Sequence, residues 1–566
     1  MTKTIKTMTI ITAMTVLLFG AIADPFDNVF AKKDTALNLD NFEARTINGT
    51  GNNQELGKED LGMAGHPLIR NSPAFYVDGI SEPISNVTVP DRKNARDISN
   101  IVFQQDSPIA AKEKISDMIW AWAQFLTHDT NHTPDSSSEL FNIEIPDDDP
   151  VFDNTIYPEI PFKRSMHSVV PEMGTAHQQF SDPTAYIDAS MVYGSDQARS
   201  DALRTFADGK MKTSTGNLLP LYPGGFPNGP CTSAECFFTG DARANEQLAL
   251  LTLHNLFVRE HNRLAENIAE NNRGLSDEEI YQISRKIVGA EIQVITYKEF
   301  IPKLLGQEAI PKYNGYDSSV NPEIATEFST VAFREQHGQI TPDLLRITNS
   351  GDVFKQPLSE TSFRPDNLAP NGSIDSILRG LAAQRAEETD TKMVDGLRNI
   401  LFGSTPASGG IDLAAFDIQR GRDHGVADYN TVRDAYGLER VTSFDQISSD
   451  SEVVEQLEEA YDSVDNIDAF VGGLAEDHLE DSTVGETFQE ILVDQFIRLR
   501  DGDRFWYQND PLFDDNKTLK QMVWNTSLDS IIKSNTDVDK IQKNVFQCSE
   551  PKIKLLDTKE KFCNQK

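Results

Sequence analysis

Residues 112–129 read KEKISDMIWAWAQFLTHD and predict a helix that packs into a protein core. Apolar side chains recur along this stretch at intervals of three and four residues, at Ile115, Met118, Ile119, Trp122 and Leu126. This spacing places them on one face of an α-helix. Gln124 and His128 lie one turn apart on a different face. Spacing alone makes His128 only a weak candidate for chemistry, because most histidines on helices have structural roles.

Helical patterns dominate the remainder of the chain. We expect helices at about 246–270, 276–304, 376–403, 452–472 and 484–501. Strand-like alternation is scarce, and long loops at 131–183 and 205–241 are typical of functional segments. The sequence predicts one large, mainly α domain with long loops and little β at 45–540. A flexible N-terminus is expected at 32–44 and a C-terminal tail at 541–566.

The first residues have the pattern of a secretory signal peptide. Lys3 and Lys6 precede an apolar run from about Met8 to Ala23. Small residues offer cleavage after Ala23 or Ala31, so we predict a signal peptide at 1–31 and a secreted, extracellular protein. An uncleaved membrane anchor is the alternative. No later stretch of the sequence is apolar enough to span a bilayer.

The composition excludes some partners. The chain of 566 residues has 88 acidic and 52 basic residues and a net charge of −36. This charge repels phosphate backbones, so nucleic acid is not expected as a partner. The acidic surface is equally explained as a means of staying soluble. The composition leaves the oligomeric state open.

Four cysteines form two local pairs in the sequence. In an exported protein, pairing is favoured over metal binding. We predict the disulfides Cys231–Cys236 and Cys548–Cys563, the second of them in the C-terminal tail. Free thiols in a reducing compartment are the alternative, and that choice depends on the signal peptide.

Ten motifs together resemble those of the animal-type haem peroxidases in the peroxidase–cyclooxygenase superfamily. They occur in family order over roughly residues 45–510: RTINGTGNN, ARDISNIVFQQ, WAWAQFLTHDTNHTPD, TAYIDASMVYGS, CFFTGDARANEQ, LFVREHNRLA, RKIVGAEIQVITYKEFIPKLLG, AFREQHG, FDIQRGRDHGVADYN and QFIRLRDGDRFWY. The resemblance implies a helical haem-peroxidase domain that holds haem b and Ca²⁺. It also implies that the enzyme reduces hydrogen peroxide, through a ferryl intermediate, while oxidising a small reducing substrate.

The resemblance assigns roles to residues that would line the haem pocket. His128 matches the distal histidine, whose neutral imidazole can take a proton from peroxide and return it to the departing oxygen. Arg243 matches the distal arginine, whose charge stabilises the anion that develops as the O–O bond breaks. Gln124 matches the glutamine that holds water or halide. His337 in FREQHG matches the axial ligand of the iron. Arg334 and Arg420 resemble propionate contacts, although salt bridges explain arginines equally well.

The resemblance also implies a calcium site next to His128. Its expected ligands are Asp129, Thr184, the Tyr186 carbonyl, Asp188 and Ser190. Alternate residues of a loop can direct oxygens to one point, as this hard cation requires. Calcium here would brace the distal helix. Without the family, T-x-Y-x-D-x-S is more typical of a strand end or turn.

Three positions depart from the mammalian members. Glu246 keeps one of two carboxylates that form haem esters, but the other is Thr127, so at most one ester link can form. Gln247 replaces a methionine that makes a further bond in one member. Asp417 replaces the asparagine beside the axial histidine, and a carboxylate there strengthens electron donation to iron. These changes predict a lower reduction potential, with poor chloride oxidation but retained oxidation of bromide, iodide, thiocyanate, phenols or amines.

Two alternatives remain open at this point. Fatty-acid dioxygenases of the same superfamily carry a radical-forming tyrosine three residues before the axial histidine, where this chain has Arg334. An adhesion protein that keeps the fold without catalysis is the other alternative. The full set of expected catalytic residues favours a peroxidase over both.

Overall fold

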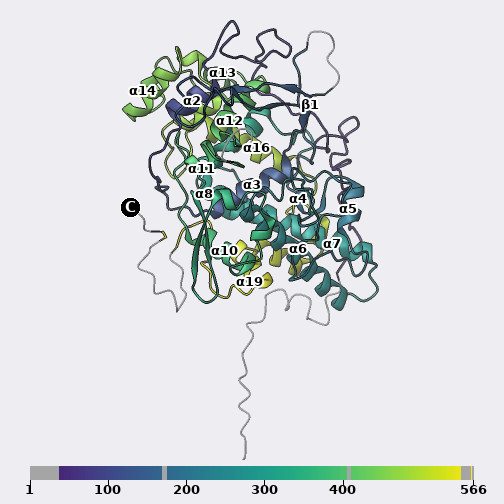
Figure 1. Cartoon of the computed structure of the whole chain (residues 1–566). Coiled ribbons are helices and arrows are strands. Elements are labelled where there is room, and N and C mark those ends of the chain that lie inside the picture. Colours follow the sequence, from purple (N-terminus) through teal and green to yellow (C-terminus); the bar gives the residue numbers. More distant parts are fainter. Residues whose placement is uncertain (1–36, 169–174, 404–409, 550–561, 564–566) are drawn as a thin grey trace, which may run out of the picture.

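Helix α3 (Met118–Thr130) runs through the middle of the molecule (Figure 1). Eleven of its thirteen residues are buried, so it contacts protein on every side rather than along one apolar face. The computed structural model describes residues 37–168, 175–403, 410–549 and 562–563. The signal peptide expected at 1–31 lies outside these ranges.

Helices make up most of the regular structure. The α-helices are α2 (Ala95–Val102), α3, α4 (Ser190–Tyr193), α5 (Gln197–Leu203), α6 (Leu248–Asn271), α7 (Asp277–Ile295), α8 (Ile301–Leu304), α9 (Thr326–Thr330), α10 (Ser373–Ala383), α11 (Asp395–Arg398), α12 (Leu413–Asp423), α13 (Tyr429–Ala435), α14 (Ser451–Ala460), α15 (Ala469–Ala475), α16 (Glu486–Asp501), α17 (Pro511–Asp515), α18 (Lys517–Trp524) and α19 (Leu528–Asn535). A π-helix, η1 (Thr296–Phe300), joins α7 to α8. The 3₁₀ helices are η2 (Ala332–His337), η3 (Leu358–Glu360), η4 (Pro365–Asn367), η6 (Phe444–Gln446) and η7 (Val464–Asn466).

The strands form three separate antiparallel pairs. β1 (Asp135–Leu140) pairs with β4 (Lys163–Ser165), and β2 (Ile143–Glu144) pairs with β3 (Glu159–Ile160). β5 (Asp343–Ile347) pairs with β6 (Val353–Pro357), with Leu345 opposite Lys355. The expected mainly α domain with long loops and little β is therefore confirmed.

Aromatic side chains fix α3 against its neighbours. The Phe125 ring stacks on Phe257 of α6 at 5.3 Å between centroids, and Trp122 packs against the same ring at 5.8 Å. The indole N–H of Trp122 donates to Thr296 Oγ1 at 3.2 Å, which satisfies its polar atom. These contacts hold the helix that carries His128 in one position.

Three expected helices differ from the observed elements because the backbone makes other pairings. The first begins only at Met118, since Ser116 N donates to the Phe546 carbonyl. The helix expected at 376–403 is wrong beyond Ala383, where segment 384–387 pairs with residues 110–116. The helix expected at 452–472 is interrupted between α14 and α15, where buried Asp468 binds two arginines.

The described parts of both termini pack on the helical body. Leu37 and Phe42, from the segment expected to be flexible, contact the core, and Asn38 N donates to Asn516. Near the other end, the Phe546 ring contacts Trp122 at 5.9 Å. Both predicted disulfides, Cys231–Cys236 and Cys548–Cys563, are confirmed. Within the described ranges, no helix has the length and hydropathy needed to cross a membrane.

Candidate active site

A cavity of about 300 Å³ is lined by both His128 and His337. α3 supplies His128 and Gln124 to this lining, and η2 supplies His337 and Arg334. Two segments that are more than 200 residues apart in sequence therefore place imidazoles around one space. Both histidines predicted from the sequence line this cavity.

His337 is held in one tautomer by a carboxylate. Asp417 of α12 accepts a hydrogen bond from His337 Nδ1 at 2.6 Å, and its other oxygen accepts from Arg334 at 2.6 Å. Asp417 is fully buried. With Nδ1 protonated, the Nε2 lone pair of a neutral His337 is free to bind a metal. Arg334 thus contacts Asp417, a contact that its sequence position did not predict.

The distal side contains a charged triad of His128, Asp241 and Arg243. His128 Nδ1 lies 3.3 Å from Asp241, which also accepts two hydrogen bonds from the Arg243 guanidinium at 3.0 and 2.7 Å. Burial, with the nearby charge of Arg243, lowers the pKa of His128 to about 4 although Asp241 opposes the shift. Burial favours the neutral acid of Asp241, but Arg243 and His128 hold its pKa well below the ordinary value. His128 is consequently a neutral base at physiological pH.

Glu246 also lines this cavity, next to His128. Its carboxylate accepts from Gln124 at 3.0 Å and lies 3.8 Å from His128 Nε2. Burial raises the pKa of Glu246 to about 7, against the charge of Arg243. Gln247 donates to Gln124 at 2.7 Å. Thr127 stands where the mammalian members have their second carboxylate. Its hydroxyl donates to the Ala123 carbonyl and accepts a hydrogen bond from the Gln336 amide.

The cavity walls suit a large planar cofactor with an apolar body and acidic side groups. A smaller cavity of about 120 Å³ shares Gln124, Glu246 and His337 with the first and is otherwise largely apolar. Its apolar lining includes Ile340, Leu344, Leu358, Leu397, Leu401 and Leu413. Arg334 and Arg420 line the larger cavity. His337 would hold the iron of a haem here, and the apolar wall and two arginines suit its ring and its propionates.

Buried oxygens gather beside the end of α3, where calcium was predicted. Asp129 accepts from Asp188 N and Ala189 N, both at 3.1 Å, and from Ser190 Oγ at 2.9 Å. Burial, together with the charge of Asp188, raises the pKa of Asp129 to about 8.

Two further buried oxygens at this site, Thr184 Oγ1 and Asp188 Oδ2, have no hydrogen-bond partner among the described residues. The Tyr186 hydroxyl donates to Leu61, which leaves only its carbonyl as an expected ligand. A bound cation would compensate two adjacent buried carboxylates, so these residues fit calcium.

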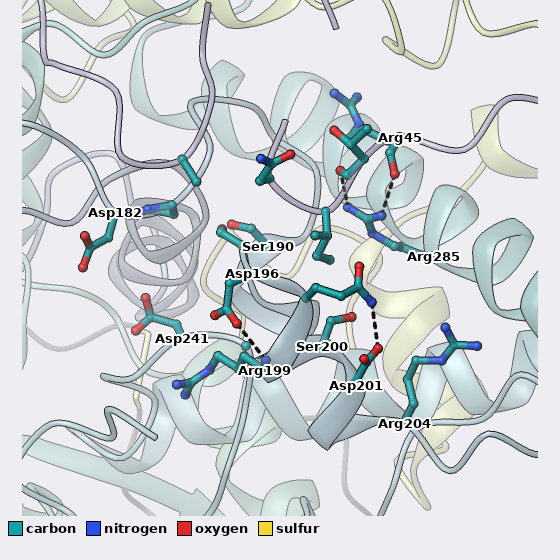
Figure 2. Close-up of a pocket in the computed structure, with 18 of the residues that line it drawn as sticks. Arg45, Asp182, Ser190, Asp196, Arg199, Ser200, Asp201, Arg204, Asp241 and Arg285 are labelled. Carbon is teal, nitrogen blue, oxygen red and sulfur yellow. Dashed lines mark hydrogen bonds between the residues drawn. The ribbon is translucent and has the colours of Figure 1, made fainter. Parts of the chain in front are cut away.

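A larger cleft of about 1100 Å³ reaches the triad from the other side of His128. Figure 2 shows Asp182 and Asp241 on one side of it and Arg45 and Arg285 on the other. His128 and His132 line both this cleft and the haem-sized cavity. The sequence reading missed Asp241, although its place two residues before Arg243 in GDAR allows a local carboxylate–guanidinium contact.

Comparisons with known proteins agree with this geometry. Peroxinectin A from Dictyostelium discoideum is 36% identical over 529 residues, which cover 89% of this chain and 96% of that protein. The solved structure of peroxidase A from Dictyostelium discoideum superposes with a TM-score of 0.82 at 33% identity, covering 89% of this chain and all of the other.

A more distant structure shares the fold alone. Fatty acid alpha-dioxygenase from Arabidopsis thaliana matches with a TM-score of 0.74 at 18% identity, over 93% of this chain and 87% of that chain. The animal haem peroxidase pattern matches residues 44–546. With His128 and His337 lining one cavity and this match over most of its length, the chain belongs to the animal haem peroxidase family and is a haem peroxidase enzyme.

Proposed function

We propose that this chain is an exported peroxidase that uses haem b to reduce hydrogen peroxide to water while it oxidises small donors. The observation that carries the proposal is that His128 and His337, from two distant segments, line one cavity. Haem supplies the iron at which peroxide is reduced. Two disulfides and the lysine-flanked apolar N-terminus support export.

Each distal side chain has a distinct task in this proposal. His128 takes a proton from peroxide at Nε2 and returns it to the departing oxygen. Arg243 stabilises the negative charge that develops on that oxygen. Asp241 orients both groups, because its carboxylate lies against His128 Nδ1 and the Arg243 guanidinium. Gln124 holds water or a small donor beside Glu246. His337 would hold the iron, and Asp417, which accepts a hydrogen bond from His337 Nδ1, would make this imidazole more electron-donating.

Replacement of His128 by alanine tests the peroxidase proposal. The wild-type protein loaded with haem should show a Soret band that shifts rapidly when a stoichiometric amount of hydrogen peroxide is added. The His128→Ala variant should bind haem but react about 100-fold more slowly or worse, because it lacks the base. His132→Ala is the control, since His132 lines the same cavity but contacts Asp182. Failure to bind haem, or equal rates in wild type and His128→Ala, would contradict the proposal.

Replacement of Asp241 by asparagine tests its positioning role. The wild-type rate of reaction with peroxide should fall as pH decreases through about 4, where the imidazole of His128 becomes protonated. Asp241→Asn removes the charge that favours protonation, so this midpoint should move to lower pH. The plateau rate should fall about ten-fold because the imidazole loses its oriented tautomer.

Two further variants make the pH comparison specific. The pH profiles with and without Asp241→Asn are both measured in protein that also carries Glu246→Gln. This removes a carboxyl group with a pKa of about 7 that lies beside His128 Nε2. Asp182→Asn is the matched control, since that carboxylate contacts His132 instead. An Asp241→Asn profile that superimposes on that of its parent would rule out the role.

We propose further that Asp129, Thr184, the Tyr186 carbonyl, Asp188 and Ser190 bind calcium. Calcium would cancel the repulsion between two buried carboxylates and brace the end of α3. Removal of calcium by chelation should therefore lower the melting temperature, and added calcium should restore it. Asp129→Asn should abolish this response, whereas Asp135→Asn, an exposed carboxylate beyond α3, should keep it. An undiminished calcium response in Asp129→Asn would exclude the site.

The residues at positions 127, 246 and 417 lead us to propose a low reduction potential for the haem iron. The Asp417 carboxylate accepts a hydrogen bond from His337 Nδ1, and Thr127 cannot form an ester with haem. Of the two positions compared, Glu246 has a carboxylate that could supply an ester link and Thr127 does not. Stronger electron donation and fewer links both stabilise higher oxidation states of the iron.

Halide selectivity tests the proposed potential. In a steady-state assay at mildly acidic pH, chloride turnover should be far below bromide turnover, while iodide, thiocyanate, phenols and amines remain substrates. Asp417→Asn should raise the ratio of chloride to bromide turnover. Acid extraction after peroxide turnover should leave haem on the wild type but not on Glu246→Gln. Chloride turnover comparable to that of bromide in the wild type would refute the low potential.

A further inference from the structure

A second group of metal-ligating side chains lies away from the haem and calcium residues. Glu113, Glu388 and His478 each place one ligand atom within 4.8 Å of the other two. They come from three separate segments: the residues before α3, the segment after α10 and the turn after α15. The fold, rather than local sequence, brings them together.

The tautomer of His478 directs a lone pair into this group. Its Nε2 lies 2.5 Å from the Thr389 carbonyl oxygen, which can only accept, so Nε2 carries the proton. In the neutral ring, Nδ1 is then the acceptor, and it faces Glu388 Oε1 at 3.7 Å. Either a proton on Nδ1 or a bound cation would remove the repulsion between these two lone pairs. A ring N–H donated to a backbone carbonyl is also the usual support of a metal-bound histidine.

The carboxylate of Glu388 points the same way. Glu388 is 4% exposed. Its Oε2 accepts from Lys112 N at 2.7 Å, whereas Oε1 accepts no hydrogen bond from any described residue. The cation nearest Oε1 is Lys112 Nζ at 3.2 Å, on a side chain that is 81% exposed. Among the described residues, this buried carboxylate oxygen therefore faces a solvated lysine and His478 itself.

We propose that Glu113, Glu388 and His478 form a binding site for a divalent transition metal of the zinc class. Imidazole selects such metals over calcium and magnesium, which prefer oxygen ligands alone. Zinc binds nitrogen and oxygen at about 2.1 Å, which places tetrahedral ligands about 3.4 Å apart. The observed 3.7 Å between Nδ1 and Oε1 needs only a small inward movement. Three protein ligands leave one position for water.

The site would connect the two sides of the haem pocket. Glu113 lies just before α3, which carries His128. Thr389, adjacent to Glu388, accepts a hydrogen bond from Gln339 at 2.8 Å, and Glu387 N donates to the Gln339 carbonyl at 3.0 Å. Gln339 follows His337 by two residues. A metal at this point would therefore stabilise the spacing of the two histidine-bearing segments.

Zinc binding to the haem-loaded full chain tests the site. The protein carries no histidine tag, and calcium is kept saturating so that the other metal site stays filled. After equilibration with zinc chloride and dialysis, elemental analysis should find one zinc per wild-type chain and a raised melting temperature. Glu388→Gln and His478→Gln should each lose the zinc and the thermal shift. Lys112→Met should bind zinc more tightly, since it removes the competing ammonium.

The control is His66→Gln, which removes a histidine that faces a single carboxylate, Glu323, and should retain zinc. Haem spectra of all variants report that they are folded. An absence of zinc in the wild type would show that Lys112 and His478 compensate Glu388 without a metal and would overturn the proposal. Zinc retained by both Glu388→Gln and His478→Gln, or located elsewhere by anomalous diffraction, would also overturn it. None of these measurements depends on peroxidase activity.

Discussion

The burial of a polar helix end is the constraint on which the candidate site depends. α3 ends in His128, Asp129 and Thr130, all buried, at a point where most helices reach solvent. Burying a carboxylate costs several kcal/mol unless charges or hydrogen bonds compensate it. Asp129 receives backbone and hydroxyl donors from the segment that forms α4, while His128 turns to Asp241. The adjacent positions of these residues make the calcium ligands and the distal base parts of one arrangement.

The sequence predicted much of the fold because helix periodicity is a local property. The expected segments 246–270, 276–304 and 484–501 correspond closely to α6, to α7 with η1 and α8, and to α16. The misplaced ends share one cause. Residues 385–387 pair with residues 110–116, and Asp468 binds Arg92 and Arg422. These long-range contacts end the helices earlier than the local sequence pattern predicts. No local signal reports such a partner.

The candidate site, too, was predicted where a local motif identifies the residue and missed where only the fold brings residues together. Motif resemblance selected His128, Arg243, His337 and Asp417. The first three line one cavity, and Asp417 contacts His337 from behind it. Asp241 was missed because its importance lies in contacting two groups at once, one of them on α3. The cluster of Glu113, Glu388 and His478 was also invisible, since its members are separated by 275 and 90 residues. Only the tertiary fold brings them within reach of one ion.

Polar contacts at both ends of α3 explain why this deeply buried helix does not slide along its axis against its neighbours. At its start, Asp117 provides no side-chain cap and instead accepts a hydrogen bond from Thr341 at 2.7 Å, four residues beyond His337 at the end of η2. At its end, Asp129 is tied to the predicted calcium ligands. Apolar contacts such as Phe125 on Phe257 tolerate small sliding, whereas hydrogen bonds with directional geometry do not. Polar contacts at the two ends therefore fix where His128 stands relative to His337, and the aromatic core supplies the bulk of the stabilisation between them.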